Sequence, residues 1–498
     1  MPFQVSPGIN VSEIDLTTVV PNVATSIGAM AGSFQWGPVL ERTSITTEND
    51  LVRVFGKPND DTQEYFHTCS NYLAYSNNLL VVRNVGASAK NAVVGDTDAG
   101  TAANVNNADD YDTDTFTDQL FVAKYPGVLG NSLKILAVDE VGYTAFKAIA
   151  LASRTVDEAL FISQFDSAPG TSTDVANAGG SLDEMHVLVI DEDGLWTGEP
   201  GQVLEKFAFV SKASDAKRPD GSSNYIKDVL RNESKYVWLG DVTQLTTLSA
   251  AAGTAAGQPK ASATFQTFDS STASEGVLGG SMGWGHNGAA ITSGQLQLGY
   301  GLFATPEVVD VNLIIGGPGV DATDTATGVY LASLVGQGAT ARNDAMVFLS
   351  PTLTDATVTK TAVAMTTTKT TYGSNNYVVM DGAWKYQYDR YRDVFFYCPM
   401  NGDTAGLVAR TEFTNDAWWS PAGMNRGAVK NIIKLSWEPT KADRDTLYQG
   451  SVNPLITMPG AGILLWGDKT CQVKPSAFDR INVRRLFIVL EKAISIAA

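Results

Sequence analysis

The stretch VNLIIGGPG (residues 311–319) carries the clearest fold signal in the chain. Val311 to Ile315 is an aliphatic run that ends in glycine and proline, which predicts a strand followed by a turn. The pattern predicts a helix over Ala322 to Val335 and a second strand over Ala345 to Leu349. A strand, a helix and a strand at this spacing favour a right-handed βαβ unit. We therefore expect an α/β arrangement in the C-terminal part of the chain.

Further elements are predicted on either side of this unit. Leu79 to Val85 is rich in β-forming residues and predicts a buried strand. Tyr377 to Met380 and Trp384 to Tyr388 flank Asp381-Gly382, and this dipeptide between two apolar runs is a hairpin signal. The first 20 residues alternate polar and apolar side chains without a helical period, which is typical of an extended arm.

The last segment, from Asp479, predicts an amphipathic helix. Four apolar residues recur on one face at intervals of 4, 3 and 4: Val483, Phe487, Leu490 and Ile494. Arg484, Arg485 and Lys492 lie off this face.

The composition limits the class of protein. With 498 residues, two or three domains are expected. The net charge of -18 argues against a nucleic-acid-binding surface, and the low charged fraction of 18% favours a chain that buries surface against partners. From Met380 to Ala498 there are 15 Lys and Arg against 12 Asp and Glu, a net of +3, which leaves -21 for the rest. We expect this part to face an acidic partner.

The N-terminus and the apolar runs bear on location. The first residues, MPFQVSPGIN, contain neither the basic nor the apolar segment of a signal peptide. No stretch of about 18 uncharged apolar residues occurs, which argues against a membrane-spanning helix. We expect a soluble protein that is made in the cytoplasm and does not insert into a membrane.

Two glycine-rich stretches match enzyme motifs in spacing only. Gly279 to Gly283 has the GxSxG spacing, but a poor strand precedes it and the only downstream histidine is His286. Gly283 to Gly288 has the GxGxxG spacing, but glycine rather than an apolar strand precedes it. We interpret both as loop and predict no catalytic or cofactor-binding residues. An oxidoreductase built around Gly283 is the enzyme alternative.

Two polar stretches resemble ligand sites. The sequence DYDTD (residues 110–114) begins like a calcium loop but lacks its glycine and its closing glutamate, which favours a solvated acidic loop. In YQYDRYRD (residues 386–393) the aspartates neutralise the arginines, so an ordinary strand face is favoured over a nucleic-acid strip. The three cysteines and three histidines are scattered, which argues against a disulfide framework and a zinc cage. We predict no metal site.

Short motifs near both ends of the chain follow the order of one protein family. The N-terminal motifs are Ser6-Pro7-Gly8-Ile9 with Glu13, Ala31 to Pro38, Asp50 to Pro58, Leu80 to Arg83 and Tyr125 to Asn131. The C-terminal motifs are Asp381-Gly382, Lys385 to Asp389, Ala405 to Leu407, Ser420 to Gly423, Asn425 to Gly427, Asn453-Pro454, Gly467 to Thr470 and Arg480 to Leu486. With these motifs the chain resembles the tail sheath proteins of phages with contractile tails, of the larger myovirus type.

The resemblance implies a structural role without enzymatic activity and without a cofactor. Subunits of such sheaths stack as six-fold rings wound helically around an inner tube, and contraction drives the tube through the host envelope for genome ejection. The implied partners are other sheath subunits, the tail tube protein, and baseplate and tail terminator proteins, with no direct nucleic-acid contact. The implied location is the virion tail after assembly in the host cytoplasm. The sheath of a DNA-free contractile injection device is the nearest alternative.

The resemblance and the composition together predict a mixed α/β (α+β) multidomain fold, with a sheath core of mixed sheet and flanking helices plus a β-rich inserted domain. We expect an extended arm at 1–20, a β-rich middle domain at 21–86 plus 120–292, a short acidic exposed insertion at 87–119, and a tube-facing α/β core at 293–498. Family members continue beyond the position of Ala498, so we expect the core to be shortened there.

Two sets of residues are predicted to contact partners. The candidate inter-subunit arm comprises Ser6, Pro7, Gly8, Ile9 and Glu13. The candidate tube-facing contacts are Arg484, Arg485 and Lys492, for which a solvated helix face is the alternative.

Overall fold

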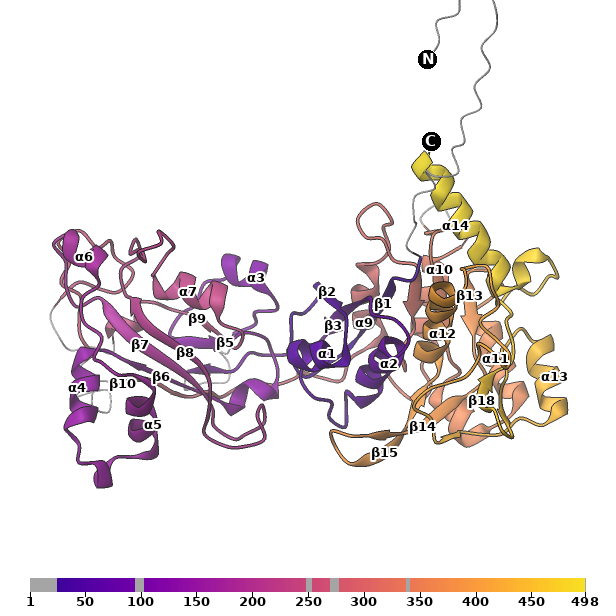
Figure 1. The fold of residues 1–498 in the computed structure, drawn as a ribbon, viewed down its shortest axis with the longest axis horizontal. Helices are drawn as coiled ribbons and strands as arrows, with labels where there is room; N and C mark the ends of the chain where they lie inside the picture. Colours follow the sequence, from indigo (N-terminus) through magenta and orange to yellow (C-terminus); the bar gives the residue numbers. More distant parts are fainter. Residues whose placement is uncertain (1–24, 95–102, 248–252, 269–276, 337–340, 498) are drawn as a thin grey trace, which may run out of the picture.

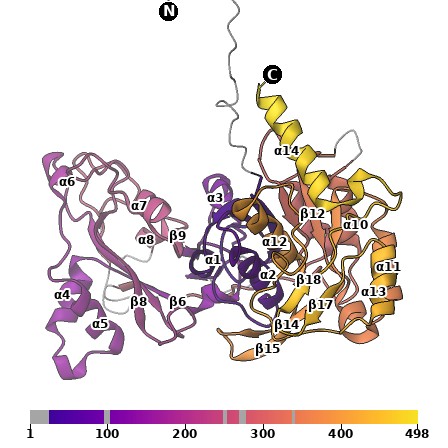
Figure 2. The same cartoon turned by 45° about the vertical axis from the view of Figure 1, so that its right-hand side comes forward.

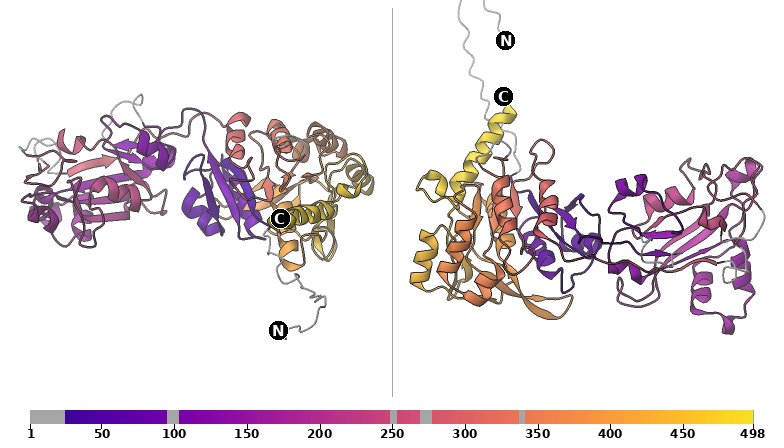
Figure 3. Two further views of the ribbon diagram at one scale, coloured as in Figure 1. Left: turned by 90° about the horizontal axis from the view of Figure 1, so that it is seen from above. Right: turned by 180° about the vertical axis from the view of Figure 1, so that it is seen from behind.

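The computed structural model of the chain describes residues 25–94, 103–247, 253–268, 277–336 and 341–497. These residues form two bodies that lie side by side and are joined by a neck (Figures 1, 2 and 3). We call residues 25–84 and 292–497 the core body, residues 93–282 the distal body, and residues 85–92 and 283–291 the neck. Both ends of the described chain lie at the core body (Figure 1). Among the helices that the structure describes, none has the length and apolar character needed to cross a bilayer.

A six-stranded sheet forms the centre of the core body. Its order is β13-β12-β11-β1-β3-β2, with all neighbours parallel except β2 and β3. The strands span Gly28–Ser33 (β1), Arg42–Ile45 (β2), Leu79–Asn84 (β3), Leu313–Ile315 (β11), Met346–Leu349 (β12) and Val378–Met380 (β13). Helix α10 (Ala326–Leu334) connects β11 to the parallel strand β12, which confirms the predicted βαβ unit. The mixed α/β class is likewise confirmed.

The predicted division of the chain is wrong for its first strands. We assigned residues 21–86 to the middle domain, but β1 is hydrogen-bonded to β11 on one edge and to β3 on the other. Gly28 lies opposite both Leu313 and Leu79. Because parallel partners can be far apart in sequence, the local pattern of β1 did not reveal this pairing.

Small residues allow helices to lie close to this sheet and to one another. A Cβ atom on Gly28 would come within 2.7 Å of the Tyr72 ring on α2 (Gln63–Leu73), and one on Gly32 within 2.6 Å of Tyr65. A Cβ atom on Gly402 of α12 (Asn401–Thr414) would come within 2.5 Å of the Thr68 carbonyl oxygen on α2. The other helices of the core body are α1 (Glu48–Phe55), α9 (Ser293–Gly301), α11 (Ala362–Thr371), α13 (Lys441–Gln449) and α14 (Ile481–Ala497).

The predicted hairpin over Asp381-Gly382 is also wrong. Strand β13 joins the main sheet, and β14 (Trp384–Asp389) instead pairs with β15 (Val394–Pro399) and β16 (Lys434–Leu435). Asp381 is buried between them and accepts a 2.8 Å hydrogen bond from Ser350 Oγ. Burial raises the pKa of this carboxyl well above its ordinary value. A second hairpin joins β17 (Leu455–Met458) to β18 (Gly462–Leu465).

The distal body contains two antiparallel sheets, of order β10-β6-β7-β8 and β4-β5-β9. The strands are β4 (Val93–Val94), β5 (Phe121–Ala123), β6 (Leu133–Val138), β7 (Glu184–Asp191), β8 (Gln202–Ser211), β9 (Val237–Leu239) and β10 (Val277–Ser281). The helices are α3 (Ala108–Thr113), α4 (Glu140–Ala148), α5 (Val156–Gln164), α6 (Thr173–Asn177), α7 (Ile226–Glu233) and α8 (Gln244–Thr247). Short 3-10 helices of the distal body span Val128–Ser132 and Leu151–Ser153. In the core body, a further 3-10 helix spans Ala477–Asp479 and a π-helical turn spans Asp355–Thr359.

The insertion predicted to be exposed at 87–119 is partly packed into the distal body. Val105 and Tyr111 are buried, and the Tyr111 ring stacks on Trp238 with centroids 4.4 Å apart. Here the apolar side chains outweigh the acidic composition that suggested a solvated loop. Among the described residues of this segment, Asp109, Asp112, Asp114 and Asp118 are exposed, and Asp112 pairs with Arg231.

A buried histidine lies in the aromatic core of the distal body. His186 on β7 stacks against Phe165 at 4.2 Å and meets Phe209 edge-on at 4.6 Å. Its Nε2 lies 3.0 Å from the Ser167 carbonyl, and its Nδ1 accepts a 3.1 Å hydrogen bond from the Phe209 N–H. Both ring nitrogens are therefore used by the neutral imidazole, and burial lowers the pKa of His186.

Leu313→Ala tests the central position of β11. Leu313 is fully buried, so removing its side chain should lower the free energy of unfolding by about 2–5 kcal/mol. Leu298→Ala on α9 is the matched control, because Leu298 is 63% exposed and its loss should change stability by about 0.5 kcal/mol or less. Urea denaturation measures both. Equal losses in the two variants would contradict the assigned core.

His186→Gln tests the buried imidazole. Since the folded state lowers the pKa of His186, its contribution to stability is present above about pH 6.5 and is lost as the pH falls below that value. We expect the wild type to lose more stability than this variant between about pH 7.5 and pH 5, as measured by denaturant unfolding at each pH. His286→Gln, which changes an exposed histidine, is the control and should retain the wild-type acid dependence. If the wild type and His186→Gln lost stability equally as the pH falls, the lowered pKa of His186 in the folded state would be refuted.

Candidate assembly surfaces and the neck between the bodies

The C-terminal helix is attached to the core body through Arg485. This side chain is 3% exposed and forms an ion pair with Glu412 at the end of α12. It also donates hydrogen bonds of 3.2 Å to the carbonyl and to Oγ1 of Thr25, the first described residue. Burial lowers the pKa of the guanidinium, and the Glu412 carboxylate opposes that shift. Arg485 thus joins α12, α14 and the start of the described chain.

Arg484 and Lys492 also have partners within the chain. The Arg484 guanidinium is buried over the Tyr377 ring, 4.3 Å from its centroid, and lies 3.1 Å from Glu491. Lys492 Nζ lies 2.6 Å from Asp310, and its side chain is 19% exposed. Both guanidinium groups are buried, which contradicts the solvated helix face given as the alternative and leaves little of either side chain for the predicted tube contact. Lys492 is only partly accessible.

The predicted apolar face of α14 lies at the surface. Ile481, Arg484, Arg485 and Ile488 recur at helical spacing and form the buried side of this helix. The apolar stripe therefore points away from the core body, with Phe487 37%, Leu490 44% and Ile494 66% exposed. We call Val483, Phe487, Leu490 and Ile494 the α14 stripe. The helix rises from one end of the core body (Figure 1). An exposed apolar stripe of this kind is typical of a protein–protein contact.

The predicted arm residues, Ser6, Pro7, Gly8, Ile9 and Glu13, lie outside the described residues. The structure does fix where that segment joins the core body, because Thr25 is bonded to Arg485 and Glu412 at the base of α14.

A second apolar surface lies on the hairpin of β14 and β15. The cross-strand pairs Tyr386–Tyr397 and Tyr388–Phe395 occupy one face of this hairpin. Tyr388 is 45% and Phe395 54% exposed, and Lys434 Nζ lies 4.8 Å from the Tyr386 centroid. We call this surface the aromatic face. It agrees with the predicted strand face, and its exposed rings are the residue types enriched at protein interfaces.

The opposite face of the hairpin holds it against the core helices. Lys385 on β14 forms a buried ion pair of 2.8 Å with Asp403 on α12, and Tyr75 donates a 3.1 Å hydrogen bond to the same carboxylate. Burial raises the pKa of Asp403, while Lys385 and Tyr75 favour its charged form. Breaking a buried pair of this kind is costly, so the hairpin is firmly fixed to α12.

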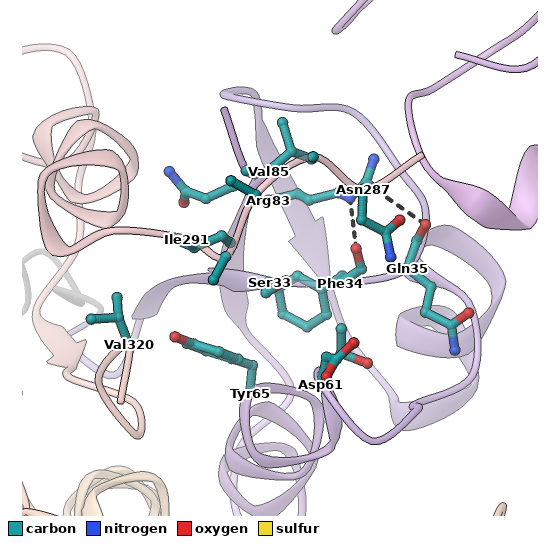
Figure 4. A pocket seen from close by; sticks show the side chains of 16 residues that line it. Ser33, Phe34, Gln35, Asp61, Tyr65, Arg83, Val85, Asn287, Ile291 and Val320 are labelled. Carbon is teal, nitrogen blue, oxygen red and sulfur yellow. Dashed lines mark hydrogen bonds between the residues drawn. The ribbon is translucent and has the colours of Figure 1, made fainter. Parts of the chain in front are cut away.

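Arg83, at the end of β3, occupies the junction between the two bodies (Figure 4). Its guanidinium donates to the carbonyls of Phe34 at 2.9 Å, Gln35 at 3.1 Å and Gly37 at 2.9 Å in the core body. It also donates a 2.7 Å hydrogen bond to the carbonyl of Pro126 in the distal body. Burial lowers the pKa of Arg83 to about 9, which leaves the group charged at neutral pH.

A cavity of about 350 Å³ lies beside this junction. Phe34, Tyr65, Ile291 and Val320 supply apolar parts of its wall, and Asp61 supplies a carboxylate (Figure 4). The wall therefore combines segments of the core body with both neck segments, the first of which contributes Val85.

The two enzyme-like motifs lie on β10 and in the second neck segment. Ser281 of the GxSxG pattern lies on β10, and its hydroxyl donates a 2.9 Å hydrogen bond to Glu192. His286 lies in the neck, where its Nδ1 accepts a hydrogen bond from the Gly288 N–H. The glycine-rich loop around Gly283 is thus the second neck segment, in agreement with the predicted loop.

Sequence reasoning missed Arg83 and Trp36, which link the two bodies. A signal existed, because Arg83 is a charged residue inside the apolar run LLVVRNV (residues 79–85) and Trp36 lies in the turn after β1. Nothing local to either residue indicated that its partners lie in the other body.

Comparison with known proteins agrees with this architecture. Two protein-family models match the chain. Residues 298–471 match the family model described as phage tail sheath protein central domain. Residues 25–83 match the one described as tail sheath protein Gp18 domain III N-terminal region. Both matched segments lie in the core body. A solved structure, the sheath tail protein of Listeria innocua, has a TM-score of 0.50 at 13% identity, covering 94% of this chain and 76% of that one. This likeness concerns the fold.

Two full-length relatives decide the family. The tail sheath protein of Enterobacteria phage T4 is 31% identical over an alignment of 578 residues, gaps included, and the alignment covers 98% of this chain and 85% of the relative. That of Vibrio phage KVP40 is 30% identical over 597 residues, with 99% and 86% covered. The chain belongs to the family of phage tail sheath proteins.

Proposed function

We propose that the chain is the repeating subunit of a contractile sheath, stacked as six-fold rings that wind helically around an inner tail tube. In this proposal the assembled sheath shortens when the baseplate triggers it and drives the tube through the host envelope. The subunit contacts other copies of itself, the tube, the baseplate and a tail terminator. Assembly takes place in the host cytoplasm before the virion is released.

The α14 stripe is the observation that carries the proposal. A helix that turns its arginines inward and its aliphatic side chains outward leaves apolar surface that a partner can bury. The predicted tube contacts were Arg484, Arg485 and Lys492, and we assign the tube contact instead to this stripe together with the partly exposed Lys492. The positive balance of the C-terminal region suits an acidic tube surface.

Two further features support association between copies. The aromatic face offers Tyr388 and Phe395 as exposed rings on a firmly held hairpin, a suitable contact for a neighbouring subunit. The segment before Thr25 joins the core body at α14, and we propose that Ser6 to Ile9 and Glu13 reach a neighbour as an extended arm. Main-chain hydrogen bonds to such an arm persist while the bodies of the subunits rotate.

The double variant F487S/L490S tests the role of the α14 stripe. Leu490 is 44% exposed, but Phe487 also meets Phe478 edge-on at 5.0 Å, so we expect the subunit to fold with a loss of about 1 kcal/mol in the free energy of unfolding. Truncating apolar anchors at an interface costs about 2 kcal/mol or more, so we expect sheathed tubes formed with the cognate tube protein to decrease by about tenfold or more in negative-stain images. The matched control is L151S/V156S, which removes two exposed apolar side chains from the distal body.

Unchanged sheath formation by F487S/L490S would reject the tube contact. An equal loss in the L151S/V156S control would also reject it, because that result would indicate a general effect of surface polarity.

A further inference from the structure

Arg83 is unusual because it is a fully buried cation held by main-chain oxygen alone. The residue is 1% exposed, and its four hydrogen bonds all end on carbonyl groups. It forms no ion pair with a carboxylate among the residues that the structure describes. A buried charge of this kind is tolerated only where the acceptors are fixed in position. The four carbonyls must therefore keep their places together.

The acceptors belong to both bodies. Three carbonyls lie in the turn at residues 34–37, which follows β1, and the fourth is that of Pro126 in the distal body. The adjacent Gly127 has a φ of +139°, and a Cβ there would come within 3.1 Å of the Gln35 carbonyl. The two backbones thus meet at a glycine, with the guanidinium between them.

The same turn also docks on the distal body. The Trp36 ring is 3% exposed and meets Tyr125 at 5.3 Å and Trp196 at 4.8 Å, both edge-on. Val39 adds a backbone hydrogen bond of 3.0 Å to the carbonyl of Asn106. The turn held by Arg83 is therefore the part of the core body that packs into the distal core.

The covalent connection between the bodies is narrow by comparison. The two neck segments pair through Lys90 and His286, which exchange backbone hydrogen bonds of 2.9 and 3.1 Å, and through a 3.0 Å bond from the Ala289 N–H to the Ala87 carbonyl. A two-stranded ribbon of this size is marginally stable at best on its own. An attachment to one side of such a ribbon is what prevents rotation about it.

We propose that Arg83 is a positioning residue, a clasp that fixes the distal body on the core body so that the two turn as one piece. The clasp acts within the single subunit, so this inference does not depend on the proposed assembly.

The variant Arg83→Met tests the clasp, because it removes all four donors and keeps an apolar stem. In the full chain, spin labels on Leu151→Cys in the distal body and Val363→Cys in the core body report the distance between the bodies. Both positions are exposed, and the three native cysteines are buried. We expect a single narrow distance distribution with Arg83, and a distribution about twofold wider or more in Arg83→Met.

Arg342→Met is the matched control. Arg342 is equally buried and donates to the carbonyls of Phe303, Val309 and Val311, but all of these lie within the core body. This variant should melt at a lower temperature and keep the narrow distribution. The clasp is overturned if Arg83→Met keeps the wild-type width, or if Arg342→Met widens the distribution equally.

Arg83→Lys covers the case in which Arg83→Met does not fold. Lysine keeps the charge but cannot reach both bodies with the geometry of a guanidinium. We expect hydrogen exchange of the neck amides at 85–92 and 283–291 to accelerate by about tenfold or more, while β6 and β7 stay protected. Unchanged exchange in the neck would overturn the proposal.

Discussion

The core body depends on the pairing of β1 along both of its edges. Hydrogen bonds to β11 and to β3 join the first described residues of the chain to a strand almost 300 positions away, and α2 can lie on this sheet only because β1 offers Gly28 and Gly32 beneath two tyrosine rings. Without this strand, β3 and β11 would each lose a partner, and the sheet that joins the two halves of the core body would be interrupted. The matched family models over 25–83 and 298–471 describe these two halves.

Local patterns predicted individual elements well and their neighbours poorly. The βαβ unit around β11 and the strand at Leu79 were predictable, because their periodicity and flanking glycines are properties of the segments themselves. The place of β1 was not, since partners in a parallel sheet are set by tertiary packing. The acidic insertion was misjudged because composition averages over Tyr111, which is buried although its neighbours are acidic.

The orientation of α14 shows why a contact surface is hard to predict from a helical pattern. The four apolar residues of the α14 stripe suggested a buried side, but Arg485 has a carboxylate and a carbonyl to bond inside the core body. Two guanidinium groups that each pair with a carboxylate can be buried, and the apolar side is then left for another molecule. A tail sheath protein is a structural component of the virion tail, and exposed apolar surface is typical of a subunit that contacts other proteins.

The neck has a consequence for how this architecture varies. The chain leaves the core body and returns to it through two segments that are hydrogen-bonded to each other at Lys90 and His286, so the ends of the whole distal body lie side by side. A module with adjacent ends can be lengthened, shortened or exchanged at little entropic cost to its host, because the host strands need not move to accommodate it. Different modules can therefore be grafted at this one point, while the sheet around β1 keeps its geometry.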